Sequence, residues 1–126
     1  MYVVFRDVEE REREVLVELG ITAFYMADVD RLGIVKVVDE ALASVDPLGN
    51  RNILLSFYID ALDPVDAHAT GTAVRGGLTM TEGMTLCDMV YMAGSLKAVD
   101  MVEVNPGLAS NLGEATRTVN AANNIL

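Results

Sequence analysis

Short runs of β-branched and aromatic residues alternate along this chain with longer segments of helical period, and this alternation constrains the fold more than any other feature. Such a pattern is typical of a parallel sheet with helices packed on its faces. We therefore expect an α/β fold with a mostly parallel sheet. The third run is apolar almost throughout, as expected for a strand covered on both faces. The expected strands are residues 2–5, 22–26, 53–59 and 98–104.

Turn and capping residues mark where the helices between these strands begin and end. Gly20 can end a helix over residues 9–19. Thr79 and Glu82 form a T-x-x-E capping box, and Asn111 can cap a final helix. The residues expected to face inward are Ile34, Val38, Ala41, Leu42 and Val45 on the second helix and Ala115, Val119, Ala122 and Leu126 on the last.

Composition and charge narrow the class of protein. The 126 residues are 52% hydrophobic and 22% charged, so we expect one folded domain over residues 1–126. A net charge of -10 has the wrong sign for attraction to nucleic acid or an anionic membrane. No apolar run approaches the roughly 18 residues that span a bilayer. The single cysteine, Cys87, and an amino terminus unlike a targeting sequence favour a cytoplasmic location.

A strand that begins at residue 2 would leave one edge of a parallel sheet without a neighbour. An open apolar edge is prone to pair with other chains unless another element covers it. We therefore expect this chain to be part of a larger fold, with a sheet that is incomplete on its amino-terminal side.

Acidic residues follow three of the expected strands at their carboxyl ends, where ligands collect in open α/β sheets. A rim of carboxylates suits either a divalent cation, which takes oxygen ligands, or a cationic substrate such as a guanidinium. The spacing does not distinguish these two, and each acid taken alone is better explained as a helix cap or an Asx turn. The acids are Asp7 and Glu9 after the first strand, Asp60 and Asp63 after the third, and Glu103 at the end of the last.

The segment over residues 56–78, SFYIDALDPVDAHATGTAVRGGL, resembles the arginase motif S-F-D-x-D-x-x-D-P…A-T-G-T-x…G-G-L-T. The likeness continues through TMTEG at residues 79–83 and MVEVNP at residues 101–106. Agmatinases share the D-x-D-x-x-D-P element, but the EVNP ending and the RDV start are more similar to arginase. The resemblance covers essentially the whole chain. It implies the carboxyl-terminal part of an arginase-like three-layer α/β fold.

The resemblance also implies roles for individual residues. Asp60 corresponds to a carboxylate that ligates the manganese pair of the family, and Glu103 to the carboxylate that receives the substrate guanidinium. Thr72 is similar to the family threonine beside that glutamate. The positions that hold the α-amino group of L-arginine or ornithine, directly or through water, are Asp7, Glu9 and Glu12, although the family usually has aspartate at the position of Glu9.

This sequence departs from the family pattern at the metal ligands. Tyr58 stands where the family has the aspartate that bridges both metals, and a phenol with a pKa near 10 is a poor substitute for that carboxylate. The family's G-G-D-H and D-A-H-x-D sequences are absent. The only histidine, His68, stands where proline is common, and we expect a solvated loop residue there. Manganese binding by this chain alone is therefore in doubt.

Three hypotheses follow. The chain is part of an arginase and hydrolyses L-arginine to L-ornithine and urea only when the missing part is supplied. Alternatively, it is a catalytically dead paralogue that binds arginine-like cations or regulates intact arginase subunits. A third possibility is an aggregation-prone product without a selected role. Resemblance to the family also implies a homotrimer, with Glu82 at the intersubunit contact, but its usual arginine neighbour is Thr81.

Overall fold

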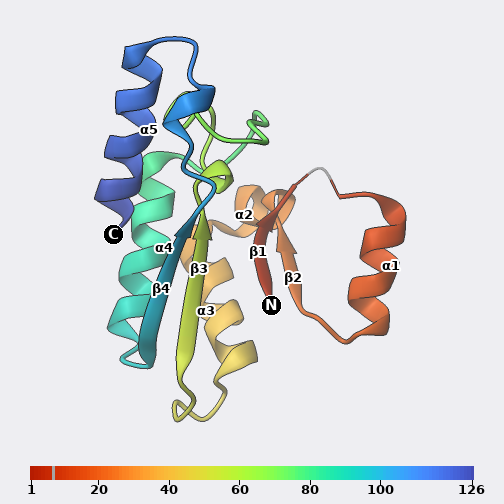
Figure 1. Ribbon diagram of the computed structural model, residues 1–126. Helices are drawn as coiled ribbons and strands as arrows, with labels where there is room; N and C mark the ends of the chain where they lie inside the picture. Colours follow the sequence, from red (N-terminus) through yellow and green to blue (C-terminus); the bar gives the residue numbers. More distant parts are fainter. Residues whose placement is uncertain (7) are drawn as a thin grey trace.

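The computed structural model describes residues 1–6 and 8–126, and it confirms the expected α/β class. Strands and helices alternate along the chain (Figure 1). The α-helices in this part of the chain are too short and too polar to cross a membrane. In chain order, the elements are β1 Tyr2–Phe5, α1 Glu10–Glu18, β2 Ala23–Tyr25, α2 Met26–Leu32, α3 Ile34–Val45, β3 Ile53–Tyr58, the 3-10 turn η1 Ile59–Ala61, α4 Met80–Met92, β4 Leu96–Val102, the 3-10 turn η2 Pro106–Leu108 and α5 Leu112–Ile125.

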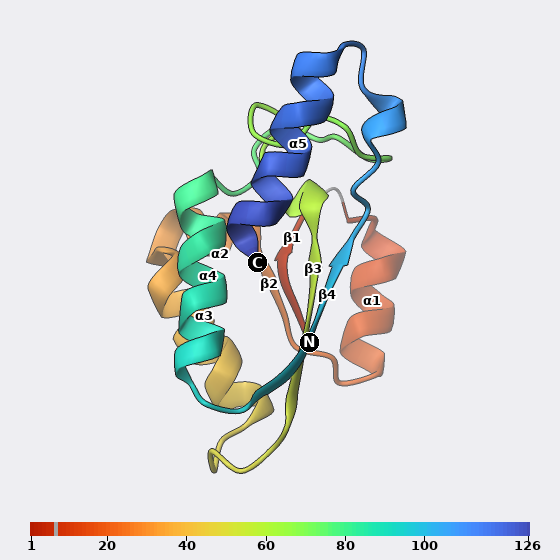
Figure 2. The same ribbon diagram turned by 60° about the vertical axis from the view of Figure 1, so that its left-hand side comes forward.

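Within the described residues, the strands form two separate parallel pairs. Strand β1 pairs with β2, with Tyr2 opposite Ala23. Strand β3 pairs with β4, with Tyr58 opposite Val102. All four strands run in the same direction, and helices α3 and α4 lie on one side of them while α1 lies on the other (Figure 2). The parallel arrangement expected from the sequence is therefore present, but divided into two halves.

Strand β3 is covered on one face, so the prediction that both faces are buried is wrong. Phe57 is buried against the helices, whereas Leu54 is 61% exposed and Tyr58 is 51% exposed. Burial alternates along the strand because successive side chains point to opposite faces. The apolar character of the run therefore does not correspond to burial in this chain.

The loop between β3 and α4 is ordered by backbone hydrogen bonds and contributes to the core. Leu62 and Leu78 are almost fully buried and form a parallel bridge at the two ends of the loop. The amide of Asp63 donates to the carbonyl of Leu78 at 2.9 Å, and the amide of Leu78 donates to the carbonyl of Ala61 at 2.9 Å. These bonds hold the loop against the carboxyl end of β3.

The final helix packs with a different face from the one predicted. Val119 is 36% exposed and Leu126 is 72% exposed, whereas Thr118 is fully buried. The hydroxyl of Thr118 accepts a hydrogen bond from the Ala69 amide at 3.0 Å and donates one to the Glu114 carbonyl at 3.1 Å. Because both polar functions are satisfied, burial of this threonine costs little. The side chains that face inward are Thr118, Ala121, Ala122 and Ile125, so of the four predicted only Ala122 is fully buried.

The two helix caps predicted from the sequence are present in the structure. Thr79 accepts a hydrogen bond from the Glu82 amide at 3.3 Å, and the Glu82 carboxylate accepts one from the Thr79 amide at 2.8 Å. Asn111 caps α5 by accepting from the Glu114 amide at 3.0 Å. The predicted strand boundaries differ by one or two residues, and helix α2 was not predicted.

Candidate functional site

A cavity of about 390 Å³ lies at the carboxyl ends of β1 and β3. It brings together Glu12, Asp60 and Thr72, three of the candidate residues, from segments far apart in the sequence. The position agrees with the rule that ligands bind beyond the carboxyl ends of parallel strands. The lining residues are Tyr2, Val3, Val4, Phe5, Arg6, Glu12, Tyr58, Asp60, Ala61, Thr72 and Val74.

The Asp60 carboxyl is affected by burial and by two charged neighbours. Burial raises the pKa of the Asp60 carboxyl, the Arg6 guanidinium opposes this, and Glu103 raises the pKa further. Two neighbouring carboxylates resist ionising together, so the pair favours a cation placed beside it. Glu103 does not line the cavity, but it lies near enough to Asp60 for its charge to act on that carboxyl.

The A-T-G-T segment lies against the end of β4. The amide of Asn105 donates to the Ala69 carbonyl at 3.0 Å. A Cβ atom at Gly71 would lie 3.3 Å from Glu103 Oε2, so a larger residue there would press on the carboxylate. Glu103 itself has a φ of 67°, which is uncommon for a residue other than glycine. Such a conformation persists only where the surroundings enforce it, and it is frequent at functional sites.

Arg6 places a cation inside this acidic rim. Its guanidinium donates to the backbone carbonyl of Ala61 at 3.2 Å and to that of Asp60. Burial lowers the pKa of Arg6, while the Asp60 and Asp63 carboxylates oppose that shift. In the sequence, Arg6 was noted only as the first residue of the RDV start, and these contacts were not predicted.

Gly77 is the sequence signal that could have found this packing. A Cβ atom there would lie 2.6 Å from the Leu62 carbonyl carbon and 2.7 Å from the Ala61 carbonyl oxygen, and it would also overlap Arg6 Nη1. The end of an arginine side chain can move aside but the backbone cannot, so the second glycine of the R-G-G-L segment is required by the close approach of the backbone of Ala61 and Leu62.

Asp63 has a structural use rather than a place in the cavity. Its carboxylate accepts hydrogen bonds from the Val65 amide at 3.0 Å and from the Gly76 amide at 2.8 Å. These two bonds lower the pKa of Asp63. For this acid, the simpler interpretation as a turn-forming residue is confirmed.

Two candidate residues remain, Glu9 and Asp7. Glu9 is exposed at the amino-terminal cap of α1, and its side chain makes no capping bond and does not line the cavity. Asp7 lies outside the described residues. The roles of Asp7, Glu9, Glu12, Thr72 and Glu103 in substrate binding, and of Asp60 in metal binding, therefore stay predictions.

The residues in this part of the chain do not fit a manganese centre. Over residues 1–6 and 8–126, no three histidine, cysteine, aspartate or glutamate side chains are grouped so that they could hold a metal ion. Tyr58 lines the cavity beside Asp60, where it offers a phenol instead of a carboxylate. His68 is exposed beside Glu114, whose pKa is lowered mainly by a hydrogen bond from the Ser110 amide and to a smaller extent by His68.

The structure defines an α/β chain with carboxylates near the carboxyl ends of its strands, and comparison with known proteins specifies the family. The sequence profile described as "Arginase family" matches residues 1–126. The chain belongs to the arginase family. It is 49% identical over 125 residues to arginase from Schizosaccharomyces pombe, covering 99% of this chain and 38% of that protein. It is 47% identical over 122 residues to human Arginase-1, covering 97% of this chain and 38% of that protein.

Solved structures agree with the sequence comparison. A crystal structure of arginase from Bacillus subtilis superposes with a TM-score of 0.84 at 35% identity, covering 98% of this chain and 40% of that one. An Entamoeba histolytica arginase in complex with L-ornithine gives a TM-score of 0.82 at 27% identity, covering 99% of this chain and 42% of that one. The chain thus spans about two fifths of the length of the relatives that it matches.

Proposed function

We propose that this chain carries the substrate-facing part of an arginase-family hydrolase and binds cationic amino acids such as L-arginine and L-ornithine. Hydrolysis of L-arginine to L-ornithine and urea then requires the remaining part of the family fold. The observation that carries this proposal is the cavity in which Glu12, Asp60 and Thr72 meet, with Glu103 coupled to Asp60. The Entamoeba histolytica relative, which was crystallised with L-ornithine, supports the choice of ligand.

The charge of the rim favours such a ligand. A guanidinium can donate two parallel hydrogen bonds to one carboxylate, and charge-assisted bonds of this kind are about twice as strong as neutral ones. The raised pKa of Asp60 means that its charged form is penalised in the empty cavity, and a bound cation would relieve that penalty. In this proposal, Glu103 holds the side-chain cation, Thr72 lies beside it, and Glu12 faces the α-amino group. The Asp60 carboxylate, whose counterpart in the family is a metal ligand, adds negative charge near the cation. Asp7 and Glu9 are assigned to the same end of the ligand.

The isolated chain should bind but not hydrolyse. Asp60 is one carboxylate, and Tyr58, which lines the same cavity, offers a phenol instead of a second carboxylate. In the described part of the chain, no further histidine or acid lies close enough to complete a metal site. We therefore infer that manganese does not stay bound unless ligands come from elsewhere.

Calorimetry and a urea assay test these two statements separately. Titration of the 126-residue chain with L-arginine and L-ornithine should release measurable heat at millimolar ligand. Asp60→Asn and Glu103→Gln should each weaken binding about tenfold or more, because each removes a charge-assisted contact. Asp66→Asn is the matched control, since Asp66 lies in the same loop but neither lines the cavity nor shifts the pKa of Asp60, as Glu103 does. Absence of heat for the unmodified chain, or equal losses for Asp66→Asn, would refute the binding proposal.

A urea assay and a metal analysis test the inferred lack of hydrolysis. Incubated with L-arginine and manganese chloride, the chain should yield no urea above a blank, and desalting should remove manganese to background by elemental analysis. Sustained release of urea would show that the inferred inactivity is wrong.

A second candidate function is that of a catalytically inactive paralogue that regulates intact arginase subunits. Tyr58 favours it, because the position of the bridging aspartate is altered while Thr72 and Glu103 remain. The two candidates differ in a mixing experiment: a regulator changes the turnover of an intact relative such as Schizosaccharomyces pombe arginase, whereas a non-regulatory chain leaves it unchanged.

Trimeric assembly and cytoplasmic location remain proposals. The Glu82 carboxylate accepts hydrogen bonds from the amide and hydroxyl of Thr79, both at 2.8 Å, so it is engaged within its own helix cap. This local use argues for a weaker intersubunit contact than in the family, which light scattering after size exclusion would measure. Cys87 is a half-buried thiol whose pKa burial raises to about 11, in keeping with an unreactive cysteine in a reducing compartment.

A further inference from the structure

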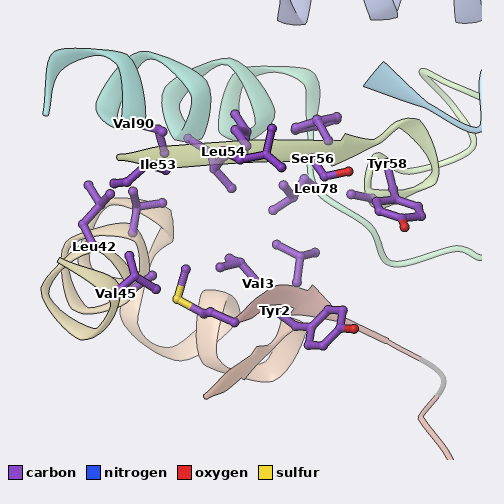
Figure 3. Close-up of a pocket in the computed structure, with 18 of the residues that line it drawn as sticks. Tyr2, Val3, Leu42, Val45, Ile53, Leu54, Ser56, Tyr58, Leu78 and Val90 are labelled. Atoms are coloured by element: carbon purple, nitrogen blue, oxygen red, sulfur yellow. The ribbon is translucent and has the colours of Figure 1, made fainter. Parts of the chain in front are cut away.

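The cavity that contains Asp60 has aromatic walls as well as carboxylates. Tyr2 and Phe5 of β1 and Tyr58 of β3 all line it. Tyr2 and Tyr58 also line an adjoining cavity of about 500 Å³, and Figure 3 shows them on opposite walls of that space. Tyr58 is 51% exposed, so its ring is accessible to a ligand. An open aromatic ring and a carboxylate therefore belong to one cavity.

The charges around this cavity suit a monovalent organic cation. Glu12 and Asp60 each supply a carboxylate, whereas Arg6 supplies one guanidinium, which is held by backbone carbonyls. Among the described residues that line the cavity, the others are uncharged, so one net negative charge is left when both acids are ionised. A single cation balances this charge, and apolar groups on that cation would contact the aromatic and aliphatic side chains of the walls.

A guanidinium already lies over an aromatic ring next to these walls. The Phe5 ring lies 4.9 Å from the Tyr2 ring and 6.3 Å from the Tyr25 ring, measured between centroids. The Arg13 guanidinium lies 4.4 Å from the centroid of the Tyr25 ring. Guanidinium groups favour such positions because the face of an aromatic ring is electrostatically negative and because they are weakly hydrated. The same kind of contact is open to a ligand at Tyr58.

We propose that Tyr58 is a specificity-determining residue of this site, whose ring stacks on the face of a guanidinium and admits guanidinium cations that carry N-methyl groups. The proposal rests on the proposed function, because it concerns the ligand of the same cavity. Stacking uses the face of the cation, whereas a carboxylate such as that of Glu103 accepts from the N–H groups at its edge, so the two contacts do not compete.

Methylation and charge shape separate this ligand class from other cationic amino acids. Asymmetric dimethylation of arginine leaves N–H groups on Nε and on one Nη, so one edge of the guanidinium can still bond to a carboxylate. The two methyl groups remove only donors that stacking does not need. A compact ammonium group has no planar face to lie on a ring. The site should therefore prefer planar guanidinium cations, methylated or not, to an alkylammonium of similar reach.

Calorimetry with three ligands tests the proposal on the 126-residue chain. L-arginine, asymmetric Nω,Nω-dimethyl-L-arginine and L-lysine are titrated separately into the parent chain and into Tyr58→Leu. The parent should bind the dimethylated ligand at least as tightly as L-arginine, and both about fivefold more tightly than L-lysine. In Tyr58→Leu, both guanidinium ligands should bind about fivefold more weakly, whereas L-lysine should change by less than about twofold.

Two further variants identify the role of the ring. Tyr58→Phe keeps the aromatic face and should bind all three ligands like the parent. Tyr91→Leu is the matched control, because Tyr91 is 70% exposed on α4 and does not line the cavity. The chain has four tyrosines and no tryptophan, so a change in ultraviolet absorbance on binding reports on tyrosine rings. L-arginine should produce this change in the parent and in Tyr91→Leu, and most of it should be lost in Tyr58→Phe.

The outcomes separate this inference from the proposed function. L-arginine binding that Asp60→Asn weakens but Tyr58→Leu leaves unchanged would keep the proposed function and overturn the role of Tyr58. Equal losses in Tyr58→Phe and Tyr58→Leu would assign the effect to the hydroxyl and also overturn it, as would binding of the dimethylated ligand about tenfold weaker than that of L-arginine. If Tyr58→Leu unfolds, an absorbance change that persists in Tyr58→Phe overturns the proposal instead. Absence of heat with L-arginine in the parent overturns both.

Discussion

Thr118→Val should destabilise this protein even though it removes no packing volume. The Thr118 side chain is fully buried, and its hydroxyl accepts from the Ala69 amide at 3.0 Å. Ala69 is also fully buried, so the substitution leaves its amide without a partner or access to water. An unsatisfied buried donor costs about 1–3 kcal/mol. At roughly 4 °C per kcal/mol for a domain of this size, the unfolding midpoint should fall by about 4–12 °C.

Thr118→Ser is the matched control, because it keeps the hydroxyl and removes only a methyl group, which costs about 1 kcal/mol. Urea denaturation measures the free energy of unfolding of both variants, and hydrogen exchange measures the Ala69 amide directly. In Thr118→Val, this amide should exchange at least about tenfold faster, whereas Thr118→Ser should retain its protection. Unchanged exchange at Ala69 in Thr118→Val would refute the reasoning, whatever the midpoints are.

Three further predictions concern the rim. Gly77→Ala should displace the adjacent backbone, since the added Cβ would lie 2.6 Å from the Leu62 carbonyl carbon and 2.7 Å from the Ala61 carbonyl oxygen. Thermal unfolding should show a loss of about 1–3 kcal/mol, and wild-type stability would contradict the packing. The pKa of Asp60 is raised on folding, so the contribution of Asp60 to stability is present below its unfolded-state pKa and is lost as pH rises through its folded-state pKa. Asp60→Asn should therefore be more stable than the parent at neutral pH but not at about pH 3. A difference in stability that does not depend on pH would contradict this prediction. The pKa of Asp63 is lowered on folding, so the contribution of Asp63 to stability is present above its unfolded-state pKa and is lost as pH falls through its folded-state pKa. Asp63→Asn should be less stable than the parent near neutral pH, and the difference should vanish in acid. Thermal unfolding over a pH series measures this difference.

Only part of the candidate site could be predicted from the sequence. The family motif named Asp60, Thr72 and Glu103 from their neighbours in the chain, and the structure places these segments at one rim. The same motif could not show that Arg6 reaches the carbonyls of Asp60 and Ala61, because those contacts join residues more than fifty positions apart.

What the sequence by itself determined is local. The capping pairs Thr79–Glu82 and Asn111–Glu114 form as predicted because each involves residues three positions apart, whose geometry the helix start imposes wherever it lies. The strand runs and the α/β class follow from the same short-range preferences and periodicity.

The tertiary structure decided which faces are buried and which edges are paired. Helix α5 buries Thr118 instead of Val119 because the Ala69 amide, far away in the sequence, needs an acceptor. Strand β3 exposes Leu54 because burial depends on which elements lie over a face, and hydrophobicity along the strand does not specify them. Within the described residues, β1 pairs only with β2 and β3 only with β4. Strand pairing depends on contacts between residues far apart in the sequence, which local preferences do not encode.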